Sequence, residues 1–122
     1  MPCNPAFGKR IRELREAKKK TDPSFSLRRF AQAVGISATY LSKVENYEFP
    51  PPASDKIKRM AHLLEVDADV LLALADKLDP ALSKIILGQP KALADFLRTA
   101  RDEKLTEAEI KELTRGIREK RK

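Results

Sequence analysis

Cations and hydroxyl groups, rather than groups typical of catalysis, are the side chains through which this sequence could act. Its 122 residues include 25 lysines and arginines against 18 aspartates and glutamates, which gives a formal net charge of +7 at pH 7. Such an excess favours a polyanionic partner, although a basic isoelectric point can also reflect solvated lysines alone. The charge therefore gains meaning only beside a structural element that fits a polyanion.

The residue types on which most enzymes depend are scarce. Cys3 and His62 are the only cysteine and the only histidine, so a zinc site with sulfur and nitrogen ligands is not expected. The four glycines are scattered and form no phosphate-binding loop. No serine has a general base in a recognisable arrangement. We therefore expect no enzymatic activity, no metal and no cofactor.

The location of the protein is predicted from three further features. A single cysteine cannot form an internal disulfide, which fits a reducing cytoplasm. The N-terminus lacks the apolar core of a signal peptide. The longest apolar run, Val70 to Ala75, is too short to span a bilayer. The sequence predicts a cytoplasmic protein without a membrane segment.

Two short helices joined by a tight turn are predicted between Ser26 and Glu45. Ser26 and Ser37 each precede a segment of helical periodicity and can cap it by accepting from free backbone N–H groups. Gly35 supplies the backbone freedom that ends a helix in the left-handed region. This is the spacing of a helix-turn-helix, whose second helix can lie in a DNA major groove. The residues expected to turn inward are Leu27, Phe30, Ala31, Val34, Ile36, Leu41 and Val44.

This stretch resembles the helix-turn-helix of the Xre/Cro-type family, which includes the lambdoid phage repressors. The resemblance extends upstream to Phe7–Glu16 and downstream to Pro51–Ala75, and so covers about residues 7–76. It implies an all-α, lambda-repressor-like domain of five helices. An ordinary helical hairpin is the alternative. The residues that carry the resemblance within the stretch are Phe30, Ala31, Gly35, Ile36, Ser37, Leu41, Val44 and Glu45.

The helices around this stretch are predicted from local signals. A first helix is expected from about Phe7 to Lys19, followed by a connector that is longer than the usual link of the family. Ser54 and Asp67 are predicted to cap the fourth and fifth helices. The fifth helix is expected to complete the core with four residues: Val70, Leu71, Leu74 and Ala75.

Beyond residue 78 the family pattern stops, but helical periodicity continues. Thr106 and Glu109 fit a capping box at the start of the last helix. The predicted organisation is a helix-turn-helix domain over residues 1–78 and a small helical C-terminal module over residues 79–122. The module is expected to serve dimerisation. Its apolar stripes consist of Leu93, Phe96, Leu97, Ile110, Leu113 and Ile117.

The resemblance also assigns the contacts to DNA, position by position. A threonine hydroxyl can donate or accept at a base edge, and a lysine can reach the acceptors of guanine. Phosphates are held by cations and hydroxyls, which set position without reading sequence. The implied base-reading residues are Ala38, Thr39, Tyr40 and Lys43, and the implied phosphate contacts are Arg10, Arg28, Ser37 and Ser42. The alternative is an exposed helix surface without a partner.

Two further positions follow from the resemblance. Many family members have a glutamine at the position of Leu27 that supports a phosphate contact and a base-reading side chain. Leucine can do neither, so Arg28 becomes the candidate for that phosphate contact. The family's glutamate at the position of Glu45 meets an arginine of the first helix, here Arg15. This pair is expected to be structural, with an exposed and weak ion pair as the alternative.

The sequence thus predicts a sequence-specific, DNA-binding transcriptional regulator, most simply a repressor. It would bind a palindromic operator in double-stranded DNA as a homodimer. The alternative, from another class, is an antitoxin-like or adaptor protein whose C-terminal helices bind a different protein.

Overall fold

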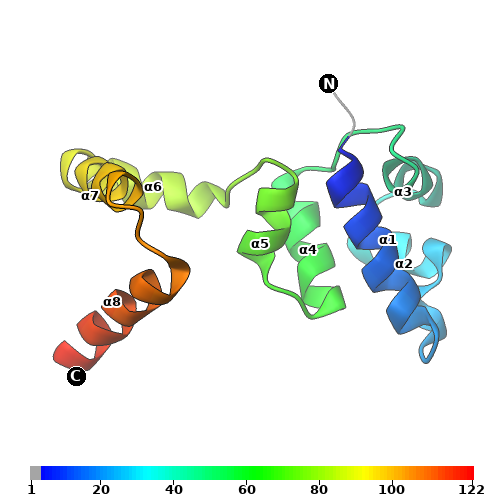
Figure 1. Ribbon diagram of the computed structural model, residues 1–122. Helices are drawn as coiled ribbons and strands as arrows, with labels where there is room; N and C mark the ends of the chain where they lie inside the picture. The colour runs from blue at the N-terminus through cyan, green and yellow to red at the C-terminus, as the bar shows by residue number, and fades with distance from the viewer. Residues whose placement is uncertain (1–3) are drawn as a thin grey trace. The chain divides into compact units, whose positions relative to one another are not determined.

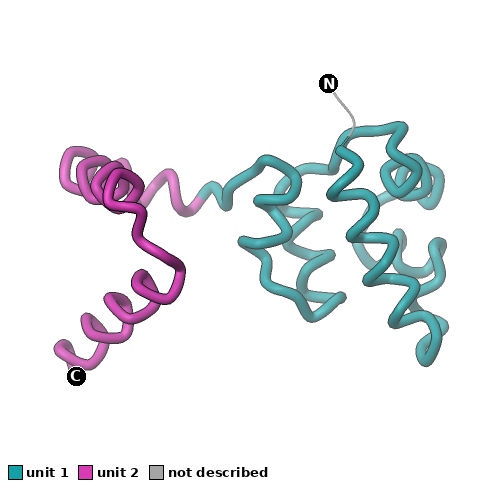
Figure 2. Tube along the Cα trace, in the orientation of Figure 1, with its two compact units in different colours: residues 1–80 teal, residues 81–122 magenta. Residues whose placement is uncertain are grey.

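The computed structural model describes residues 4–122, which form eight α-helices and one short 3₁₀ helix, with no strand in that range (Figure 1). The predicted all-α class is confirmed. The chain divides into two compact units, residues 1–80 and residues 81–122 (Figure 2). In order, the elements are α1 (Pro5–Lys19), η1 (Pro23–Phe25), α2 (Leu27–Val34), α3 (Ala38–Glu45), α4 (Ser54–Leu64), α5 (Ala68–Leu74), α6 (Pro80–Gly88), α7 (Pro90–Asp102) and α8 (Glu107–Lys120).

Side-chain caps begin several of these helices where the sequence predicts them. Ser26, Ser37 and Asp67 each accept a hydrogen bond from the backbone N–H three residues further on. In the second unit, Thr106 and Glu109 form the predicted capping box at the start of α8. These bonds satisfy N–H groups that have no partner within the helix.

The prediction that Ser54 caps α4 is wrong. Ser54 is the first residue of the helix, and the N-cap position belongs to Ala53, which makes no side-chain cap bond. The carbonyl oxygen of Ala53 already accepts from the Ile57 N–H at 3.1 Å. Helical bonding thus starts one residue earlier than expected, directly after the proline run that leads into α4.

One hydrophobic core lies in the first unit, where α4 and α5 pack side by side and α1 contacts α3 (Figure 1). The predicted inner face of α5 is partly wrong, because Val70 is 64% exposed whereas Leu72 is completely buried. The α5 sequence is apolar nearly all round, so periodicity could not orient it. The largest fully buried side chains are Phe7, Phe30, Ile11, Leu41, Ile57, Met60, Leu71, Leu72 and Val44.

The long connector between α1 and α2 is folded against the domain. The Asp22 carboxylate accepts from the Ser24 N–H at 2.9 Å and so caps η1. The ring of Phe25 stacks on that of Phe30 with centroids 5.9 Å apart. The ammonium of Lys18 lies 5.6 Å from the centroid of the Phe25 ring. The additional residues therefore extend the edge of the core.

The second unit has no closed core of its own. Every residue from 81 to 122 is exposed or only partly buried. Apolar side chains of α7 and α8 stand at the surface, among them Phe96 and Ile117. Three short helices in one chain thus leave their apolar stripes largely uncovered.

Candidate nucleic-acid interface

The turn between α2 and α3 fixes how the second helix leaves the first. Gly35 has a φ of 91°, in the left-handed region that favours glycine. The N–H groups of Gly35 and Ile36 donate to the carbonyl oxygen of Ala31 at 2.9 and 3.0 Å. Ala31 is buried, and its small side chain lets the two helices approach closely. The geometry is that of a helix-turn-helix.

The exposed face of α3 borders an open hollow of about 320 Å³. Three of the four predicted base-reading residues line it: Ala38, Thr39 and Lys43. Two neighbouring segments contribute Leu27, from the start of α2, and Glu48, from the loop after α3. The hollow thus combines apolar, hydroxyl and charged groups on one accessible surface. Its complete lining is Leu27, Ala38, Thr39, Ser42, Lys43 and Glu48.

Tyr40 is not part of this hollow. Its hydroxyl donates to the carbonyl oxygen of Pro50 at 2.9 Å, and its ring centroid lies 5.8 Å from that of Phe49. Partial burial raises the pKa of the Tyr40 hydroxyl above its ordinary value. Tyr40 therefore contacts the loop that follows α3, whereas the resemblance implied that Tyr40 reads bases.

Lys43 connects the hollow to the same loop. Its carbonyl oxygen accepts from the N–H groups of Glu48 and Phe49 at 2.8 and 3.2 Å. Its ammonium lies 5.3 Å from the centroid of the Phe49 ring. These bonds turn the loop back beside α3. Glu48 is not among the predicted site residues, because only this return path, formed by tertiary contacts, brings it to the hollow.

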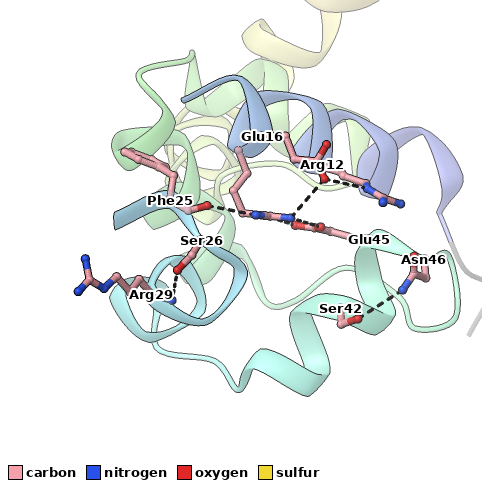
Figure 3. A network of polar contacts seen from close by, with 9 residues as sticks. Arg12, Glu16, Phe25, Ser26, Arg29, Ser42, Glu45 and Asn46 are labelled. Atoms are coloured by element: carbon pink, nitrogen blue, oxygen red, sulfur yellow. Dashed lines mark hydrogen bonds and ion pairs between the residues drawn. The ribbon is translucent and has the colours of Figure 1, made fainter. Parts of the chain in front are cut away.

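The residues expected to contact phosphate separate into two groups. Arg28 is exposed beside Leu27 on the first turn of α2. Ser37 and Ser42 lie on the α3 side; Ser37 caps the helix, and the Ser42 hydroxyl accepts from the Asn46 side-chain amide at 3.3 Å (Figure 3). Ser42 lines the hollow, and Arg28 and Ser37 are the chain neighbours of Leu27 and Ala38, which also line it.

Arg10 belongs to a different surface. It lines a cavity with Leu14 of α1 and with Val70 and Leu74 of α5. Its guanidinium lies 3.9 Å from the Glu13 carboxylate. The structure therefore does not bring Arg10 together with the other predicted DNA contacts.

A buried ion pair anchors the C-terminal end of α3 to α1. Arg15 Nε and Nη2 donate to the two carboxylate oxygens of Glu45, each at 2.8 Å, and Nη1 donates to the Phe25 carbonyl oxygen at 3.1 Å (Figure 3). The two residues are only 5% and 3% exposed. The hydrogen bonds with Glu45 raise the pKa of Arg15, against the opposing effect of burial. A bidentate pair of this kind fixes orientation as well as distance.

Among residues 4–122, no group of three histidine, cysteine, aspartate or glutamate side chains could hold a metal ion. Within the same range, no helix has both the length and the apolar character that a membrane crossing requires.

Residues 6–74 match the family model described as a helix-turn-helix domain. Because this match covers more than half of the chain, the protein belongs to the helix-turn-helix domain family, and the predicted family resemblance is confirmed.

A curated relative from Bacillus subtilis (strain 168) is the uncharacterized HTH-type transcriptional regulator RghRB, which is 38% identical over 69 residues. The matched region is 57% of this chain and 46% of the relative, so the chain covers less than half of that protein. Among solved structures, one chain of a SinR protein/SinI protein complex is similar to this chain, with 23% sequence identity and a TM-score of 0.46. The alignment covers 82% of this chain and 99% of the chain in the complex.

Proposed function

We propose that this chain is a sequence-specific DNA-binding transcriptional regulator that acts through the exposed face of α3. The observation that carries the proposal is the open hollow in which Thr39 and Lys43 stand on the second helix of a helix-turn-helix. Hydroxyl and ammonium groups at this position match the donors and acceptors that base pairs present in the major groove. The net charge of +7 favours the approach of a polyanion.

In this proposal the protein is a cytoplasmic repressor that has no enzymatic activity and needs no cofactor. Arg28, Ser37 and Ser42 are the favoured phosphate contacts, since Ser42 lines the hollow and the other two adjoin lining residues in the chain. Binding close to a promoter would then exclude polymerase.

The second unit is the proposed dimer contact. Five of the six predicted stripe residues are between 43% and 62% exposed in a single chain, and Leu93 is partly buried. A second copy can cover these stripes symmetrically, because a twofold interface uses the same patch on both partners. Two α3 helices would then face two half-sites of a palindrome, roughly 34 Å apart.

The direct test is a selection from randomised DNA duplexes by the full-length protein, followed by sequencing of the bound fraction. The proposal predicts an enriched palindromic motif whose half-sites are separated by about one helical turn. Recovery of random sequences only, at moderate salt, would overturn it. Moderate salt matters because phosphate contacts alone give binding that weakens steeply as salt rises.

The dimer contact has its own test in the full-length protein. Leu113→Asp places a charge on the exposed stripe of α8 and should convert the dimer to a monomer in sedimentation experiments. Val70→Asp is the matched control, since Val70 is also an exposed apolar residue on a helix, in the first unit. Loss of the dimer in the control alone would instead place the contact on α5.

The same uncovered stripes support one alternative proposal, an antitoxin-like or adaptor protein whose C-terminal helices bind a different protein. A wild-type protein that sediments as a monomer at all concentrations, and a selection that returns no motif, would together favour this alternative.

A further inference from the structure

The hollow in front of α3 contains an apolar surface that hydrogen-bonding readout leaves unexplained. Leu27 and Ala38 both line it. Each is only partly buried, and each packs against the hydrophobic core of the domain. Both side chains are therefore held in place while part of their surface faces the hollow.

The position of Leu27 is fixed by the helix that it begins. The preceding residue, Ser26, caps α2 by accepting from the Arg29 N–H at 3.2 Å. Leu27 therefore stands on the first turn of a capped helix, opposite the first residue of α3. A contact made from such rigid elements can discriminate between partners that differ by a single methyl group.

The hollow suits a base edge better than a phosphate group. Glu48 and Lys43 both line the hollow, so their opposite charges leave its lining without a net positive charge that would attract a phosphate. An apolar side chain placed over a base donor or acceptor would leave that group without its hydrogen bond. Thymine alone presents an apolar group in the major groove, its C5-methyl.

We propose that Leu27, together with Ala38, is a specificity-determining contact that receives the methyl group of a thymine at one position of each half-site. The inference rests on the proposed function and names the base that this part of the surface reads.

The test uses the full-length protein and the best duplex from the selection described above. Each thymine is replaced in turn by deoxyuridine, which removes only the methyl group. At one position of each half-site, wild-type affinity should fall about fourfold, the fold-change that corresponds to one buried methyl group. The Leu27→Ala protein should bind the thymine and deoxyuridine duplexes equally well.

Two further variants separate base reading from loss of folding. Leu27→Gln introduces a polar side chain of similar length, and this protein should also lose the preference for thymine. It should bind best to a duplex with adenine at that position, because glutamine forms hydrogen bonds with the adenine edge. Leu63→Ala is the matched control, because Leu63 is a partly buried leucine that packs on the same core from α4. It should retain the fourfold ratio.

The outcomes distinguish this inference from the proposed function. If the selection yields a motif but no deoxyuridine lowers affinity, or if Leu27→Ala and Leu27→Gln keep the wild-type ratio, the role of Leu27 is refuted and DNA binding stands. A selection without any motif would refute the proposed function, and the inference with it.

Discussion

The backbone of Gly8 packs directly against the carbonyl group of Val44, so closely that a Cβ atom on Gly8 would overlap the Val44 oxygen. The same Cβ would lie 3.2 Å from the ring of Tyr47. Gly8 belongs to α1 and Val44 to the last turn of α3. The missing side chain therefore lets α1 touch the end of the helix that carries the proposed base-reading residues.

Replacing Gly8 by alanine should destabilise the first unit. The added methyl group meets backbone, which cannot rotate away as a side chain could, so we expect a loss of about 1–3 kcal/mol in the free energy of unfolding. Chemical denaturation followed by circular dichroism measures it. Gly116→Ala, at a helical glycine with open space around it, should leave the first unit unchanged. Equal stability of the Gly8→Ala and wild-type proteins would contradict the close packing.

The Arg15–Glu45 pair gives a second stability prediction. Glu45→Ala leaves a buried guanidinium without its carboxylate, which should cost about 3–5 kcal/mol. Glu13→Ala, which removes the exposed partner of Arg10, should change stability by no more than about 1 kcal/mol. Thermal melting measures how much stability each variant loses relative to the wild type. Similar melting temperatures would show that the buried pair is not structural.

The pair formed by Lys18 and Glu65 predicts a dependence of stability on pH. Their side chains are 2.7 Å apart, and the hydrogen bond from Lys18 lowers the pKa of Glu65 below its ordinary value of 4.5. A lowered pKa in the folded state stabilises the fold above the ordinary value, and this stabilisation is lost as the pH falls through the folded-state pKa.

Glu65→Gln, which removes the charge and keeps the shape, isolates this effect. The variant should be less stable than the wild type at about pH 7, and the difference should vanish at an acidic pH below the lowered, folded-state pKa of Glu65. Urea titrations at both pH values measure the difference. A difference in stability that is equally large at the acidic pH would show that it does not arise from the charge of the Glu65 carboxylate.

Features set by local chemistry could be predicted from the sequence. The caps at Ser26, Ser37 and Asp67 and the left-handed turn at Gly35 depend on residues within one helical turn of each other. Such contacts are encoded by spacing alone. They were enough to place the two helices of the helix-turn-helix.

Features set by tertiary contacts could not be predicted in the same way. Glu48 lines the hollow, and Tyr40 does not, because the loop after α3 folds back beside the helix. The need for glycine at residue 8 arises from a carbonyl group 36 residues away along the chain, at residue 44. The exposure of Val70 reflects how α5 is rotated on the core, and an apolar helix carries no pattern that specifies this rotation.

The ratio of affinities for the selected duplex and for random DNA measures whether the exposed face of α3 reads base edges. Lys43→Ala should reduce this discrimination by about 1–3 kcal/mol, and Thr39→Ala by less. Lys9→Ala, at an exposed lysine that lines a different surface with Arg10, should leave the ratio unchanged. Folded Lys43→Ala and Thr39→Ala proteins that keep the wild-type ratio would show that this face of α3 does not read base edges.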